Sequence, residues 1–160
     1  MNRVNRILHH PMWKGAIMQI TELERQRPFC GHGPEHLLQV ARLAYIENLE
    51  QNWNISKELI YGAALLHDIG RGIQYTDGIP HEEAGYAMAS RILDDCGFGG
   101  NEKDEILDAV RNHREGRIRN EGTLRGLIFR ADKLSRNCFS CEAEKDCNWS
   151  REKKNWEIER

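Results

Sequence analysis

The chain has little net charge and no long apolar run, and each shortage excludes a class of protein. Its 23 Lys and Arg nearly balance 25 Asp and Glu, for a formal net charge of −2, which argues against broad binding to nucleic acid or acidic membranes. No apolar run approaches the roughly 20 residues of a membrane span. The N-terminal stretch MNRVNRILHHPMWKG lacks the apolar core of a signal peptide. We therefore expect a cytoplasmic protein with no nucleic-acid partner and no membrane partner.

Patterns typical of β-strands are also missing, because apolar and polar residues do not alternate and the β-branched and aromatic residues are scattered. The 160 residues suffice for one domain with a sizeable core. Apolar spacing, prolines and capping residues predict an all-α protein. The expected helices cover about residues 12–26, 34–51, 56–68, 82–96, 101–113 and 123–137. We expect a loop over 70–80, and a cysteine-rich turn followed by a short charged helix at the end of the chain.

Ionisable side chains fall on or beside the apolar faces of five of these helices. In GAALLHDIGRG, an apolar run ends at His67 and Asp68, and four more such residues are His36, His81, His113 and Asp132. Each one alone is most simply a buried histidine or a helix cap. Together they would be costly to bury without a compensating charge. A divalent ion offsets that cost, and His with Asp suits first-row transition metals.

Four motifs around these residues resemble the HD superfamily of metal-dependent phosphohydrolases. They are HLLQVARLA from His36, GAALLHDIGR around His67 and Asp68, AVRNHRE around His113 and RADKLSR around Asp132. The resemblance implies a helical bundle: one HD-type domain over 1–160, with its core at about 30–136 and a cysteine-rich extension at 137–160. It also implies a first metal on His36, His67, Asp68 and Asp132, and a second metal on Asp68, His81 and His113. His32, four residues before His36, remains a rival for the first ligand.

The activity implied by the resemblance is hydrolysis of a small phosphorylated substrate, such as a nucleotide, by a metal-bound hydroxide. The metal would be Fe, Mn, Co, Ni or Zn, because nitrogen-rich ligation argues against Mg alone. Asp68 would be catalytic as the bridging ligand, and Arg71 as a phosphate contact, since a guanidinium fork fits phosphate oxygens. Arg114 and His32 are further candidates for substrate binding. Solvated positions for both arginines stay open.

The sequence also bears on the number of metals, and it leaves alternative functions and an oligomer open. The acid that single-metal nucleotidases of the superfamily carry shortly after the HD pair is absent at residues 69–72, which favours the two-metal group. Some relatives use two irons for oxygenation, so a di-iron oxygenase is the second hypothesis. A non-catalytic metal- or nucleotide-sensing module is the third. The final segment, with Trp149 and Trp156, could pack on the body of the protein or on another subunit, so an oligomer stays open.

Cysteines form a separate motif near the end of the chain. Cys138, Cys141 and Cys147 have the spacing C-x2-C-x5-C, and crowded thiols in an intracellular chain are usually metal ligands. Cys30 is the preferred fourth ligand, with Cys96 and His32 as alternatives. Zinc, a [4Fe–4S] cluster and unligated thiols all stay open; the spacing resembles the iron–sulfur loop of some DNA glycosylases. We expect this site to be peripheral, so that losing a cysteine lowers stability more than activity.

Overall fold

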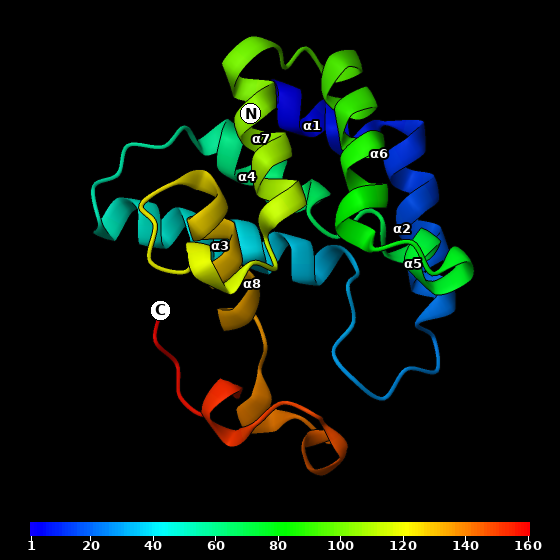
Figure 1. Ribbon diagram of the computed structural model, residues 1–160, viewed down its shortest axis with the longest axis vertical. Helices are drawn as coiled ribbons and strands as arrows, with labels where there is room; N and C mark the ends of the chain where they lie inside the picture. Colours follow the sequence, from blue (N-terminus) through cyan, green and yellow to red (C-terminus); the bar gives the residue numbers. More distant parts are fainter.

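The computed structural model describes residues 1–160, which form a bundle of α-helices without β-strands (Figure 1). This confirms the all-α prediction. The α-helices are α1 (Asn2–His9), α2 (Pro11–Leu23), α3 (Pro34–Glu50), α4 (Lys57–Leu66), α5 (Arg71–Asp77), α6 (His81–Cys96), α7 (Gly100–Asn112) and α8 (Leu124–Leu134). Short 3-10 turns follow at Gly116–Ile118, Cys138–Ser140, Glu144–Asp146 and Arg151–Lys153. None of the helices combines the length and apolarity that crossing a membrane requires.

The centre of the bundle consists of α3, α4, α7 and α8, with α6 packed on α7. Small side chains bring α3 and α4 together: Ala41, Ala44, Ala63 and Ala64 are fully buried. Alanine allows close approach of two helices and has the best intrinsic helix propensity. The core comprises 30 buried hydrophobic residues that belong to one cluster. His36 in α3 and His67 after α4 therefore face each other across a closely packed helix pair.

Six of the predicted helices agree with α2, α3, α4, α6, α7 and α8 to within a few residues. The sequence analysis missed α1, which has too few apolar positions to show a clear period. Val4 and Ile7 of α1 are nevertheless buried, and Arg3 bonds both Glu58 (2.7 Å) and Glu102. Contacts with distant helices, which the local sequence does not reveal, therefore stabilise α1.

The loop expected over 70–80 is wrong in part, because α5 occupies most of it. The glycines that suggested a loop lie at the boundaries of this helix and within it. Gly78 ends α5 with φ 73°, the left-handed conformation that glycine adopts readily. A Cβ on Gly72 would lie 2.5 Å from Oε1 of Gln19, so a larger residue here would require the Gln19 side chain to move.

The short charged helix expected at the end of the chain is also wrong. Residues 137–160 contain only 3-10 turns, the last at Arg151–Lys153. Lys154 and Asn155 follow this turn, and both donate their side-chain hydrogen bonds to backbone carbonyls elsewhere in the fold. This C-terminal segment lies below α8 in Figure 1, and the loop between α2 and α3 extends toward the same side of the bundle.

Candidate metal centre

The six histidines and aspartates singled out from the sequence converge from five helices. His36 lies in the first turn of α3, His67 and Asp68 directly follow α4, His81 begins α6, His113 follows α7, and Asp132 lies in α8. None of the six side chains is more than 8% exposed. They form two groups that share Asp68, and within each group the ligand atoms lie within 4.8 Å of one another.

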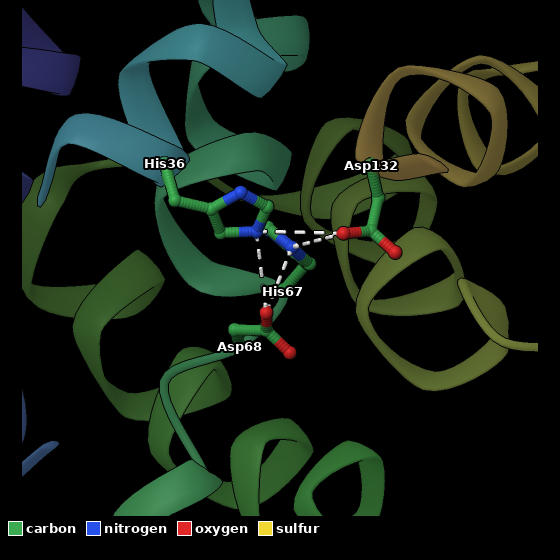
Figure 2. Close-up of side chains that lie close together, drawn as sticks. All are labelled: His36, His67, Asp68 and Asp132. Atoms are coloured by element: carbon green, nitrogen blue, oxygen red, sulfur yellow. Dashed lines mark ion pairs between the residues drawn. The ribbon is translucent and has the colours of Figure 1, made fainter. Parts of the chain in front are cut away.

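The first group contains His36, His67, Asp68 and Asp132, whose polar ends point toward one another in Figure 2. Nε2 of His36 lies 3.4 Å from Oδ2 of Asp68 and 3.4 Å from Oδ1 of Asp132. Nε2 of His67 lies 3.2 Å and 3.8 Å from the same two oxygens. Two imidazole nitrogens and two carboxylate oxygens thus surround one point.

The second group lies on the other oxygen of Asp68. Oδ1 is 3.1 Å from Nε2 of His81 and 3.7 Å from Nε2 of His113. The two Nε2 atoms are 3.0 Å apart, and two imidazole lone pairs at that distance need a proton or a cation between them. Asp68 therefore offers one carboxylate oxygen to each group.

In His67 and His113, a hydrogen bond from the ring to a backbone carbonyl fixes which ring nitrogen faces the ligand groups. Nδ1 of His67 lies 2.8 Å from the carbonyl of Ala64, and Nδ1 of His113 lies 2.7 Å from the carbonyl of Val110. A carbonyl can only accept, so each Nδ1 carries a proton, and Nε2 is the nitrogen that can offer a lone pair to a cation. Metal-ligating histidines in proteins show this arrangement.

The other two rings are oriented by side chains that the sequence analysis did not single out. Nδ1 of His81 donates to Oε1 of Gln74 at 2.6 Å. Nδ1 of His36 lies 3.1 Å from Oγ of Ser135, whose hydroxyl donates to the carbonyl of Asp132. The only sequence feature that could have indicated Ser135 is the motif RADKLSR, to which it belongs. Gln74 lies in the expected loop, and no sequence feature indicated it.

The donor set fits a divalent cation. Nε2 of His67 and Oδ2 of Asp68 are buried and have no hydrogen-bond partner, a costly state unless a charge compensates it. Burial alone would raise the pKa of Asp68, but His67, His113 and His36 hold it well below its usual range. Burial alone would lower the pKa of His67, but Asp68 and Asp132 raise it to about 9. A cation would replace the proton that these carboxylates otherwise keep on His67.

Gly70 positions the second group by letting α6 approach the end of α4. A Cβ on Gly70 would lie 2.2 Å from the carbonyl oxygen of His81 and 2.5 Å from the amide nitrogen of Gly85. Both neighbours are backbone atoms, which cannot move aside without shifting α6. A hydrogen atom at this position is therefore what allows His81 to reach Asp68.

Beside the cluster lies a cavity of about 550 Å³, bordered by Asp132. All three residues expected to bind substrate line it: Arg71, Arg114 and His32. Nε of Arg71 donates to Oδ1 of Asp68 at 2.9 Å, and Arg114 bonds Glu82 at 3.2 Å. His32 belongs to neither ligand group.

Further cations surround the same cavity, and two of them contact Asp132. Nζ of Lys133 lies 2.5 Å from Oδ2 of Asp132, and Nη2 of Arg136 lies 3.3 Å from Oδ1. The basic residues that line the cavity are Arg27, Arg71, Arg114, Lys133, Arg136 and Lys154, against the acids Asp132, Glu144 and Asp146. This excess of positive charge favours an anionic ligand.

The cysteine motif lies closer to the metal centre than the peripheral position that the sequence analysis expected. Cys30, Cys138, Cys141 and Cys147 all line the cavity that Asp132 borders, and none of them forms a disulfide. Cys96, an alternative fourth ligand, instead belongs to the hydrophobic core and does not line the cavity.

A bundle that buries two histidine–aspartate groups at the ends of its helices is the architecture of a metal-binding helical domain. The family model of the HD domain matches residues 34–137, and the chain belongs to this family. This confirms the resemblance inferred from the motifs. Family and buried groups together indicate binding of divalent metal.

The chain is also similar to two known proteins. It is 39% identical over 158 residues to an uncharacterized protein of Clostridium beijerinckii, a match that covers 99% of each chain. It is 33% identical over 122 residues to ribonuclease Y of Thermus thermophilus, a match that covers 76% of this chain but only 19% of the ribonuclease. No solved structure matches the chain.

Proposed function

We propose that the protein is a two-metal phosphohydrolase that cleaves a small phosphorylated substrate, with a nucleotide as the first compound to test. The observation that carries this proposal is the shared carboxylate of Asp68, which offers Oδ2 to one histidine pair and Oδ1 to another. Membership of the HD family supports hydrolase-type chemistry. The partial match to a ribonuclease, an enzyme that by its name acts on RNA, supports phosphate esters as the bond class.

Each metal would have its own ligands. The first would be held by His36, His67, Asp68 and Asp132, and the second by Asp68, His81 and His113. Imidazole-rich sets favour Fe, Mn, Co, Ni or Zn. When bound, such ions acidify a coordinated water and offset the negative charge that develops on phosphate oxygens.

The protein's own side chains would hold and orient the substrate. Arg71 uses Nε to bond Asp68, and its two terminal nitrogens make no hydrogen bond within the protein, so this fork is free for phosphate oxygens. Arg114 and His32 would contact the substrate from other parts of the cavity lining. The Nδ1 hydrogen bonds of the four histidines would keep the ligand nitrogens in place during turnover.

Metal analysis combined with a phosphate-release screen tests this proposal. Protein purified without chelator should hold about two transition metals per chain and release phosphate from at least one nucleotide, with a short RNA as a comparison substrate. His67→Ala should lose the metals and the activity, by more than the roughly 10- to 100-fold typical of a lost second-shell partner. The control is His9→Ala, because His9 is exposed on α1.

Other outcomes would replace the proposal. A His67→Ala variant that keeps both metals and turnover would refute the assignment of the site. Oxygen-dependent turnover with redox-active iron would favour a di-iron oxygenase. Tight nucleotide binding without turnover would favour a sensing module.

A further inference from the structure

The C-terminal segment, residues 137–160, has almost no apolar core of its own. None of the 30 residues of the hydrophobic core comes from it. Its large apolar side chains are largely exposed: Phe139 at 49%, Trp156 at 43% and Ile158 at 80%. A short segment that cannot bury apolar surface needs another source of stability, such as a disulfide or a metal.

Hydrogen bonds supply only part of that stability. Nζ of Lys154 bonds the carbonyl of Glu144 at 2.8 Å, which closes the segment on itself. Nδ2 of Asn155 bonds the carbonyls of Lys133 and Arg136 at 2.7 and 2.9 Å, which attaches the segment to the end of α8. Individual bonds of this kind contribute about 1 kcal/mol each, which is little for ordering a segment with no regular helix.

Four cysteines line one cavity where the segment faces the loop between α2 and α3. Cys30 comes from the loop, whereas Cys138, Cys141 and Cys147 lie at the 3-10 turns, and all four line one cavity without forming a disulfide. Cys30 lies close enough to Cys141, Cys138 and Arg136 for their charges to act on its thiol. The loop and the segment thus place four cysteines around one cavity.

The spacing of the sulfurs distinguishes between two kinds of metal centre. Neither of the groups with three or more ligand atoms within 4.8 Å of one another contains a cysteine. A tetrahedral zinc site, with Zn–S bonds of about 2.3 Å, places its sulfurs less than about 4 Å apart. In a cubane iron–sulfur cluster each thiolate binds a different iron, so the four sulfurs lie farther apart. No three of the four sulfurs lie within 4.8 Å of one another, so they are not arranged as a closed tetrahedral zinc site requires, and a larger cluster is the better match.

The charges around the thiols fit the same ligand. A [4Fe–4S] cluster with four thiolates carries net negative charge, and Arg27, Arg136 and Lys154 line the cavity beside the cysteines. Lys154, which bonds Glu144, also lies near Cys147 and Cys138. Positive groups close to the sulfurs stabilise thiolates and the cluster that they would hold.

We propose that Cys30, Cys138, Cys141 and Cys147 ligate a [4Fe–4S] cluster that joins the C-terminal segment to the loop between α2 and α3. This site is separate from the histidine–aspartate groups, and the proposal does not depend on the hydrolase function. The cluster would border the same cavity as Arg71 and Asp132, so it would form part of the wall that a substrate meets.

Anaerobic purification of the full chain from iron-supplied cells tests the cluster. The wild-type protein should contain about four acid-labile sulfides per chain, an equal amount of iron assigned to them, and a broad visible absorbance from sulfur-to-iron charge transfer. Cys141→Ala should lose the sulfide and this absorbance completely. The matched control, Cys96→Ala, removes a cysteine outside the cavity and should keep both.

His67→Ala separates the two metal sites, because it should lose the metals of the histidine–aspartate groups and keep all the sulfide. One zinc per chain that disappears in Cys141→Ala, with no sulfide in the wild type, would overturn the proposal in favour of a zinc site. Four freely alkylated thiols in freshly isolated protein without sulfide would overturn it as well. Both outcomes come from the wild-type protein, so they count even if Cys141→Ala does not fold.

Discussion

Residues 2–134 and residues 137–160 are stabilised by different interactions. The bundle buries 30 hydrophobic residues in one cluster, whereas the C-terminal segment contributes none of them and is held by polar contacts such as those of Lys154, Asn155 and Arg160. Asp132, which borders the cavity between them, belongs to the bundle, whereas three of the four cysteines that line the cavity belong to the segment. The difference teaches that the bundle side of the cavity is held by apolar packing, whereas the side formed by the segment is held by a few polar contacts.

The largest expected effect comes from opening the core of the bundle. Leu37 in α3 is fully buried, so Leu37→Ala should lower the free energy of unfolding by about 2–5 kcal/mol, measured by urea denaturation. Leu49→Ala in the same helix is the control, because Leu49 is 57% exposed and should change stability by less than about 0.5 kcal/mol. Equal effects of the two substitutions would contradict a packed core at α3.

A second test targets the close approach of α6 to the end of α4. Gly70→Ala should destabilise the protein by about 1–3 kcal/mol, since the new methyl group would overlap the backbone of His81. The shift of α6 should also weaken metal binding at the second group. In Gly15→Ala the new Cβ meets no atom within 4 Å, and this variant should gain about 0.5–1 kcal/mol through helix propensity. Melting curves and metal content check both; a Gly70→Ala variant that behaves like wild type would contradict the packing.

A third test concerns Glu24, which anchors the loop that carries Cys30. Glu24 bonds the backbone amide of His32 at 2.7 Å, the His32 ring, and the hydroxyl of Tyr75 at 2.6 Å. Burial alone would raise the pKa of Glu24, but the bonds from His32 and Tyr75 lower it to about 2, from 4.5. The depressed pKa means that this contribution is complete above about pH 4.5 and is lost as the pH falls toward 2.

Glu24→Gln should therefore cost about 1–2 kcal/mol at neutral pH, and the difference from wild type should shrink below pH 4.5. Thermal melts across this pH range measure it. Glu22→Gln provides the control, since Glu22 is 63% exposed and pairs only with Arg25. A difference that stays constant from pH 7 to pH 3 would show that the carboxylate charge of Glu24 contributes nothing.

The smallest expected change in the free energy of unfolding comes from the C-terminal segment, where the effect should stay local. Asn155→Ala removes two hydrogen bonds to the end of α8 and should cost about 1 kcal/mol. Hydrogen exchange should accelerate over residues 137–160 and stay unchanged in α3 and α4, because the core does not include the segment. Uniform acceleration across both regions would show that they unfold as one unit.

The sequence predicted what depends on helical period and missed what depends on contacts between elements. His36, His67, His113 and Asp132 repeat at helical spacing with apolar neighbours, so their common burial followed from the pattern. Their roles as ligands stay predictions until metal is measured.

Features set by tertiary contacts could not be read from local sequence. Helix α1 depends on burial of Val4 and Ile7 against other helices, and α5 on its contacts with α2 and α6. Gln74 reaches His81 across two elements, which no local pattern reveals. The shared cavity of the cysteines and Asp132 likewise depends on how two loops lie in space.

The dispersal of the ligands along the chain has a consequence for folding. An ion among His36, His67, Asp68 and Asp132 would act as a cross-link between α3, the end of α4 and α8. In the unfolded state, long flexible stretches of chain separate these side chains, so their combined affinity for an ion is far lower. By mass action, the folded state then gains about 2.7 kcal/mol when the free ion reaches a hundred times its Kd. The concentration of available metal would thus help to set the stability of the fold.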